Sequence, residues 1–236
     1  MKKIQPKYLK LKSLLLMLLL FYTSTAYAYS FSFLWFKKNG LAQAQTQQAR
    51  ELKSINPQIL SLVYKAYEKA KGMGVAKKSL VTIVDYTLPS TEPRLWVVDL
   101  HKKTVLYHTH VAHGSGNGGN LPLRFSDKPG SKQASLGVFV TGKTYQGGHG
   151  LSLVLHGLEK GINGNAERRR IVVHGAHYVN PAISGELGRL GRSSGCLAVE
   201  NHLAKKLIQT IQEGSLVFSY YPDKNWLKKS AFLLDF

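Results

Sequence analysis

The alternation of apolar and polar residues from position 80 onward constrains the fold of this chain most. Val, Leu, Tyr and Phe recur there in short runs with a period of two, and Pro, Gly, Asn and Ser separate the runs. Such a period is typical of β-strands, whose side chains point alternately to the two faces of a sheet. We therefore expect strands over 80–86, 94–101, 104–112, 135–141, 151–157, 170–174 and 215–221.

Two other segments have the period of a helix. In the first, Asn56 can cap the amino end, Pro57 suits the first turn and Gly72 can end the helix. The second is expected over about 202–212, where apolar residues share one face and Gly214 follows. The chain should therefore adopt a mainly β fold with flanking helices.

The first 28 residues differ from the rest. Five lysines precede or flank the start of an unbroken apolar run over 14–22, and Ala26-Tyr27-Ala28 is a small-x-small cleavage site. This pattern indicates an export signal that is cleaved after Ala28, and hence a periplasmic or secreted protein. An uncleaved membrane anchor is the alternative, because residues 31–36 are also apolar, although the run 14–22 is shorter than the ~20 residues of a spanning helix.

The rest of the chain should divide into three parts. Residues 29–54 are aromatic and then rich in Gln and Ala, which suggests a flexible lead-in. Residues 55–222 contain the predicted strands and both helices and should form one domain. Residues 223–236 remain as a C-terminal tail.

The charge of the chain is strongly positive. The formal net charge is +19, and +14 remains when the five lysines of the signal are removed. Such a field favours anionic partners, which for an exported protein are envelope polymers and lipid head groups. No nucleic-acid-binding motif is present, so we expect no nucleic acid partner. The basic N-terminal region could contact a membrane surface.

Cys196 is the only cysteine. Exported proteins that depend on disulfides carry several cysteines, so this thiol is either buried and inert or functional. It ends a loop of small residues, Ser193-Ser194-Gly195, which favours presentation of the thiol over burial in a core strand. A cysteine in such a loop is a candidate nucleophile in its thiolate form.

His174 is the candidate base for this thiol. It follows a β-branched run and precedes Gly175, whose carbonyl could fix the tautomer of the ring. An imidazole can take the thiol proton and later return it to a leaving amine. Gly195 allows close approach to a substrate carbonyl, and the N–H groups around Gly195 and Cys196 could point at the oxyanion.

These two motifs resemble those of the L,D-transpeptidase (YkuD-type) catalytic domain. That family has a His-Gly pair followed by Ser/Thr-x-Gly-Cys, which here are His174-Gly175 and Ser193-Ser194-Gly195-Cys196. A variant subgroup reads Gly-Arg-Ser-x-Gly-Cys-x-Ala-Val, and residues 191–199 fit it throughout. The resemblance covers about residues 55–222, with weaker agreement at 111–114, 125–126, 129–131, 135–137 and 145–150.

The resemblance implies a β-rich catalytic domain with the Cys-His pair in a groove. Cys196 would attack peptidoglycan stem peptides at the bond between diaminopimelate and D-alanine and form a thioester, which an amine of a neighbouring stem peptide resolves. Cys196 and His174 would be catalytic, with Gly195, Ser194 and Gly175 supporting the oxyanion or the tautomer. The candidate substrate contacts are Arg192, Ser193, Tyr145 and His149.

Two positions depart from the better-studied members of the family. Those members usually have His before Gly-Cys and Arg or Asn two residues after Cys, where this chain has Ser194 and Ala198. Arg192 or Arg189 could substitute for the missing side chain. Two alternatives therefore stay open: an L,D-carboxypeptidase that uses water as acceptor, and a non-catalytic cell-wall-binding protein on the same fold.

Other chemistries are less well supported. His108, His110 and His113 have a spacing that can gather zinc ligands, but no acidic partner is nearby, so we expect neither a metal nor a cofactor. A sortase would need an Arg soon after its cysteine, and none follows Cys196. The charge run 168–170 is typical of a solvated face, with carboxylate or phosphate binding as the alternative.

Overall fold

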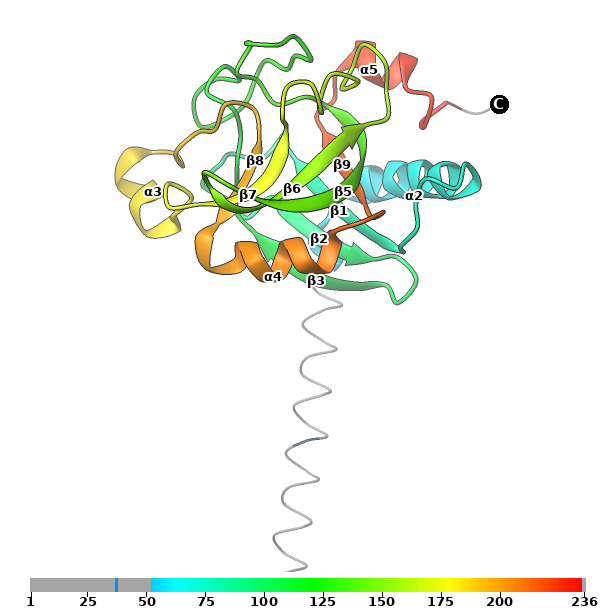
Figure 1. Ribbon diagram of the computed structural model, residues 1–236, viewed down its shortest axis with the longest axis horizontal. Helices are drawn as coiled ribbons and strands as arrows, with labels where there is room; N and C mark the ends of the chain where they lie inside the picture. Colours follow the sequence, from blue (N-terminus) through cyan, green and yellow to red (C-terminus); the bar gives the residue numbers. More distant parts are fainter. Residues whose placement is uncertain (1–36, 38–51, 235–236) are drawn as a thin grey trace, which may run out of the picture. The chain divides into compact units, whose positions relative to one another are not determined.

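The computed structural model in Figure 1 describes Lys37 and residues 52–234. The predicted export signal and nearly all of the predicted lead-in lie outside the described residues. Residues 52–234 contain a nine-stranded sheet with the order β3-β2-β1-β9-β5-β6-β7-β8-β4. Its strands are β1 (Leu80–Asp85), β2 (Leu95–Asp99), β3 (Thr104–Thr109), β4 (Val111–Ala112), β5 (Gly137–Gly147), β6 (Gly150–Gly157), β7 (Val172–Ala176), β8 (Leu197–Glu200) and β9 (Leu216–Tyr220).

The sheet is nearly closed. Its two outermost strands, β3 and β4, follow each other in the chain and only His110 separates them. Because a single residue can span only a few ångströms, the two edges of the sheet must curl toward each other. The mainly β fold with flanking helices that the sequence predicts is therefore confirmed.

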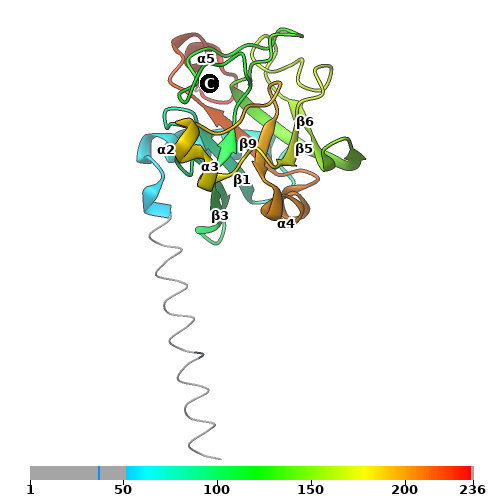
Figure 2. The ribbon, with the colours of Figure 1, turned by 90° about the vertical axis from the view of Figure 1, so that its left-hand side faces the viewer.

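Four helices flank this sheet in the described part of the chain. They are α2 (Pro57–Gly72), α3 (Pro181–Leu187), α4 (Asn201–Ile211) and α5 (Lys224–Lys229), and α4 and α5 lie at opposite ends of the sheet in Figures 1 and 2. The predicted cap of α2 is confirmed, because the Asn56 side chain accepts the N–H of Gln58 at 2.8 Å. No helix among the described residues is long and apolar enough to cross a membrane.

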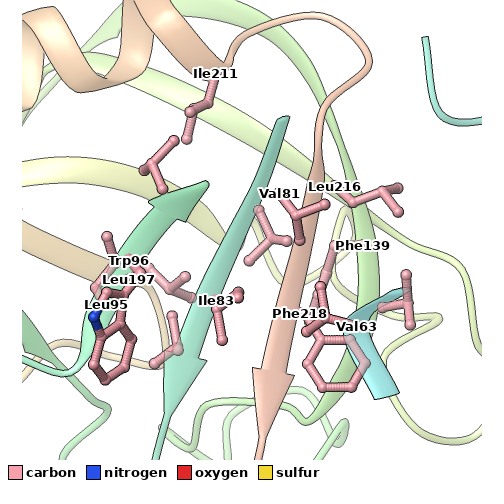
Figure 3. Close-up of a cluster of buried hydrophobic side chains, with 14 of the residues drawn as sticks. Val63, Val81, Ile83, Leu95, Trp96, Phe139, Leu197, Ile211, Leu216 and Phe218 are labelled. Atoms are coloured by element: carbon pink, nitrogen blue, oxygen red, sulfur yellow. The ribbon is translucent and has the colours of Figure 1, made fainter. Parts of the chain in front are cut away.

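The main core lies between the sheet, α2 and α4. Figure 3 shows Val81 and Ile83 of β1 beside Leu216 and Phe218 of β9 in this core, with Val63 of α2 packed nearby. β7 and β8 are buried on both faces. Their other face contributes to a second apolar cluster, which we call the small cluster, made of Ala112, Ala176, Val179, Leu190 and Ala198.

Several elements differ from the prediction. The expected strand over 104–112 is interrupted at His110, and β5 extends six residues past the predicted end at 141 to form a hairpin with β6. β8 and α3 had no counterpart in the prediction. The predicted C-terminal tail contains α5, which the Asp223 carboxylate caps by accepting the N–H of Trp226 at 2.7 Å.

Trp226 anchors α5, and its loss should be costly. Its side chain is 1% exposed, it packs on Phe218, and its indole N–H lies 3.2 Å from a carboxylate oxygen of the buried Glu159. We expect Trp226→Ala to lower the free energy of unfolding by about 3–5 kcal/mol, because large aromatic-to-alanine changes in a core cost that much. Urea denaturation followed by circular dichroism measures this.

The matched variant for this prediction is Trp226→Phe. It keeps most of the ring packing but removes one donor from the Glu159 carboxylate, so it should cost about 1–3 kcal/mol. A loss below about 1 kcal/mol for Trp226→Ala would contradict the role of α5 in the core.

Candidate active site

Strand register places His174 and Cys196 on the same face of the sheet. β7 and β8 are parallel, with Val173 opposite Leu197 and His174 opposite Ala198. Val173 and Leu197 point into the main core. Because side chains alternate along a strand, His174 points to the opposite face, and so does Cys196, which lies two residues before Ala198. Cys196 and His174 are therefore diagonal neighbours across the parallel pair of β7 and β8.

The ring of His174 is held in one tautomer. Nδ1 lies 2.9 Å from the carbonyl oxygen of Gly175, which can only accept, so Nδ1 carries the proton and Nε2 is left as a base. Gly175 has no side chain because α4 packs directly on it: a β-carbon there would lie 2.6 Å from Asn201 Oδ1 and 2.8 Å from Ala204 Cβ.

The environment keeps His174 neutral. Its side chain is almost fully buried. Burial lowers the pKa of His174, the Gly175 carbonyl partly opposes this shift, and the nearby His149 lowers the pKa further. A neutral imidazole is the form that can accept a proton, so His174 has the protonation state of a general base at neutral pH.

Cys196 is in a protonated state in this conformation. Its Sγ lies 3.6 Å from the carbonyl oxygen of Arg170, a geometry in which the thiol donates. Burial raises the pKa of the Cys196 thiol, while the Val172 backbone and the Arg169 charge act in the opposite direction. Among the described residues, the thiol is hydrogen-bonded to this carbonyl and not to His174. The thiol must therefore leave the Arg170 carbonyl before His174 can take its proton.

The loop before Cys196 is fixed by Ser193. The Ser193 hydroxyl donates to the Cys196 carbonyl at 2.7 Å and accepts the Gly195 N–H at 3.0 Å. Gly195 has φ +117°, and a β-carbon there would lie 2.7 Å from the Gln133 carbonyl oxygen. Both features require glycine at this position. Ser194 between them is exposed.

This arrangement changes which amides could serve an oxyanion. We expected the N–H groups of both Gly195 and Cys196 to point at the substrate, but the Gly195 amide is engaged by Ser193. In the part of the chain that the structure describes, the Cys196 amide has no acceptor outside the β ladder. Of the two amides, that of Cys196 therefore stays a candidate donor to an oxyanion.

Arg192 and Arg189, the two arginines near the loop, donate hydrogen bonds to backbone carbonyl groups. Arg192 is exposed, and its Nη1 donates to the Gly118 carbonyl at 2.8 Å, which ties the loop to residues 114–119. Arg189 donates to the carbonyl of Leu190 at 3.0 Å. Neither contact involves Cys196, and we find no support for the idea that they replace the residue missing at Ala198.

Ala198 is fully buried in the small cluster. It stands beside His174 of β7 and Ala112 of β4, and Leu190 packs in the same cluster. An Arg or Asn side chain at this position would have to displace this cluster, because protein interiors are close-packed. The departure at residue 198 is therefore compensated by apolar packing.

Tyr145 and His149 lie on the face of the sheet that carries His174. Tyr145 is paired with Ser152 across β5 and β6, and Ser152 is paired with His174 across β6 and β7. His149 lies in the turn between β5 and β6, and its ring stacks on that of His174 with centroids 4.4 Å apart and an interplanar angle of 21°. The structure thus brings both predicted groove residues to the face that carries His174. Ser152 was not predicted.

Tyr178 is a further residue that the sequence did not indicate. It is half-buried, packs on the small cluster, and lies so close to Gly191 that a β-carbon there would be 2.5 Å from Tyr178 Cβ. Burial and then the charge of Cys196 raise the pKa of Tyr178 to about 12, so its hydroxyl group stays protonated. No sequence pattern marks this residue.

The three histidines considered as zinc ligands have separate partners. His108 stacks on Trp96 with centroids 4.7 Å apart. His110 contacts Glu200 at 3.3 Å. His113 accepts a hydrogen bond from the buried Arg94 at 2.7 Å. Burial is the larger cause that lowers the pKa of His113 to about 4, and the charge of Arg94 is the second. No cluster of three His, Cys, Asp or Glu residues suited to a metal occurs in the described residues.

Comparison with known protein families identifies the family to which this fold belongs. The model of the L,D-transpeptidase catalytic domain matches residues 51–220. The chain therefore belongs to the L,D-transpeptidase catalytic domain family. No curated protein matches it.

Solved structures are similar to this chain at low identity. An L,D-transpeptidase from Mycobacterium smegmatis has 13% identity and a TM-score of 0.37, covering 61% of this chain and 59% of that one. The helical cell shape determining protein Pgp2 from Campylobacter jejuni has 16% identity and a TM-score of 0.41, covering 65% and 53%. Bd1075 from Bdellovibrio bacteriovorus has 15% identity and a TM-score of 0.37, covering 61% and 48%. The matched region spans less than two thirds of each of these proteins.

Proposed function

We propose that this chain is an exported cysteine L,D-transpeptidase that acts on peptidoglycan stem peptides, in the variant subgroup defined by residues 191–199. The observation that carries the proposal is the placement of Cys196 on the same sheet face as His174, whose Nδ1 is tied to Gly175 and whose Nε2 is left as a base. The net charge of +14 that remains when the five lysines of the signal are removed suits stem peptides that carry free carboxylates.

The first half-reaction forms a thioester. His174 Nε2 takes the thiol proton, and Cys196 Sγ attacks the carbonyl carbon between diaminopimelate and the terminal D-alanine. The Cys196 N–H donates to the oxyanion that forms. The tetrahedral intermediate collapses, the C–N bond breaks, and His174 returns the proton to the leaving nitrogen, so that D-alanine departs and the acyl group stays on sulfur.

The second half-reaction transfers the acyl group. An uncharged amine of a neighbouring stem peptide attacks the thioester carbonyl, and His174 accepts the proton that the amine loses. The C–S bond then breaks, the thiolate recovers the proton, and a new peptide crosslink remains. Water in place of the amine gives a carboxypeptidase. The exposed Ser194, two residues before Cys196 where better-studied members of the family have His, keeps that outcome as the second candidate.

Disaccharide-tetrapeptide fragments of peptidoglycan test the function. The purified protein should release D-alanine, and mass spectrometry of the products should show crosslinked dimers. Tripeptide fragments without dimers would indicate hydrolysis. The absence of D-alanine and of both products would contradict an enzyme and favour a binding role.

The pH profile should report the depressed pKa of His174. Catalysis requires the base form of His174. As the pH is lowered, kcat/KM should therefore stay constant past the ordinary histidine pKa of about 6.5 and fall only when the pH passes through the lowered pKa of His174. We expect His149→Ala to move this acidic limb to higher pH, because it removes a neighbouring positive charge and exposes the His174 ring to water.

The control for this profile is His156→Ala. His156 lies on β6, pairs with Glu167 at 2.8 Å and has no described contact with His174. The acidic limb of the His156→Ala profile should match that of the wild type. An unmoved limb in His149→Ala, or a limb moved to lower pH, would contradict the proposed coupling.

Export is a separate part of the proposal. Cleavage after Ala28 would give a mature chain that begins at Tyr29. N-terminal sequencing of the protein from a periplasmic or culture fraction tests this, and a chain that retains residues 1–28 would instead support the membrane anchor.

A further inference from the structure

Arg169 is a buried arginine inside a run that looks solvated in the sequence. Its side chain is 3% exposed, whereas Arg168 and Arg170 are exposed. Nη1 donates to the Ser126 carbonyl at 2.8 Å and to the Ser135 hydroxyl at 2.7 Å. Nη2 donates to the Ser131 hydroxyl at 3.3 Å and to the Gln133 carbonyl. The side chain thus joins residues 126–135 to the turn that precedes β7.

The guanidinium lies directly behind the nucleophile loop. A β-carbon on Gly195 would be only 3.1 Å from Arg169 Nη2, so the charge packs against the residue before Cys196. Arg170, the residue after Arg169, carries the carbonyl that accepts the hydrogen bond of the Cys196 thiol. Arg170 has φ +55°, an unusual backbone conformation for a residue other than glycine, and its N–H donates to the Glu167 carbonyl at 2.9 Å.

We propose that Arg169 is a positioning residue of the active site: its buried charge stabilises the Cys196 thiolate, and its hydrogen bonds to residues 126–135 hold the guanidinium against the backbone of Gly195. This role rests on the proposed function, because it assumes that Cys196 reacts as a thiolate. Both Nη atoms already donate to protein oxygens, so the charge acts on sulfur through its field.

The charged groups around Cys196 determine the direction in which Arg169 shifts the pKa of the thiol. The Arg169 charge lowers the pKa of the Cys196 thiol, against the larger effect of burial. Cys196 also interacts electrostatically with Tyr178 and Tyr86, both of which remain protonated, and it shares its face with neutral His174.

The Asp127 carboxylate opposes this effect. Asp127 Oδ1 lies 3.8 Å from Arg169 Nη1, and the Asp127 side chain is 7% exposed. Its negative charge offsets part of the field that reaches sulfur. Removing the Arg169 charge should therefore raise the pKa of the Cys196 thiol, and removing the Asp127 charge should lower it.

Alkylation of the single cysteine by iodoacetamide tests this role without any peptidoglycan substrate. Intact-mass measurement of the alkylation rate as a function of pH gives the apparent pKa of Cys196, since the chain has one cysteine. Arg169→Met should raise that pKa and slow alkylation at pH 7 about tenfold, which corresponds to one unit. Arg169→Lys should recover part of the rate, and Arg168→Met, which removes an exposed charge next to it, should titrate as the wild type.

Asp127→Asn separates a field effect from a structural effect. Its amide oxygen can still accept the Asn165 N–H that Asp127 Oδ2 accepts at 2.9 Å. The neutral side chain should lower the apparent pKa of Cys196 and speed alkylation at pH 7. A purely structural ion pair would instead give damage in the same direction in both variants. If Arg169→Met does not fold, Asp127→Asn alone decides the sign.

The outcomes distinguish the two proposals. A thiol that alkylates in the wild type but titrates identically in folded Arg169→Met, or an apparent pKa that rises in Asp127→Asn, would overturn the role of Arg169 alone. A wild-type thiol that iodoacetamide never modifies would overturn the proposed nucleophile and this role with it.

Discussion

Cys196→Ala should reduce the rate of D-alanine release from tetrapeptide fragments by a factor on the order of 10⁴ or more, because loss of a covalent nucleophile removes the whole acyl-enzyme route. The fold should be unaffected. The described hydrogen bond of Sγ is the one to the Arg170 carbonyl, which lies at a partly exposed position, and alanine fits the same backbone. Steady-state release of D-alanine, with thermal melting as the folding control, measures both.

Cys196→Ser is the matched variant. It keeps a polar side chain that can donate to Arg170, but its hydroxyl is far less acidic than a thiol and is not activated by the same base at neutral pH. We expect it to be nearly as inactive as Cys196→Ala. An alanine variant that retains a rate within tenfold of the wild type would show that another group carries the reaction.

His174→Ala should lower kcat/KM by about 10²–10⁴-fold, the usual contribution of a positioned general base and acid. The cause is the loss of the Nε2 base, which the Gly175 carbonyl fixes in place by binding Nδ1 at 2.9 Å. The variant should also show a diagnostic pH response. Hydroxide can deprotonate the thiol, so thiol alkylation recovers as the pH rises, whereas turnover does not, because the leaving amine still lacks an acid.

His108→Ala is the control for this variant. His108 lies on β3, stacks on Trp96 and binds the Pro93 carbonyl at 3.1 Å, so its loss removes a histidine without touching the site. It should retain the wild-type kcat/KM. A His174→Ala enzyme with unchanged kcat/KM would exclude His174 as the base.

Strong local signals account for the elements that were predictable. The Asn56 cap and the Pro57 start determine where α2 begins, and the apolar face of α4 packs into the core. β8 has no such signal. It is buried on both faces, so its residues show no alternation and its pairing with β7 depends on the tertiary fold. α5 is short, and its anchor, Trp226, is held by a hydrogen bond to Glu159, which lies far away in the sequence.

The candidate site divides in the same way. Cys196 and His174 were indicated by residues next to them in the sequence, Gly195 and Gly175, which mark a tight loop and a close helix contact. Arg169 was not, because a run of three arginines looks solvated and only the fold buries the middle one. Its partners come from residues 126–135, some forty positions away.

The most direct test of the central claim is labelling with a carbapenem, a β-lactam class that acylates L,D-transpeptidase cysteines. The intact protein should gain the mass of one carbapenem, and peptide mapping should place the adduct on Cys196. Cys196→Ala should gain none, and His174→Ala should label far more slowly. An unlabelled wild-type protein, or an adduct on any residue other than Cys196, would contradict the proposal that Cys196 is the nucleophile.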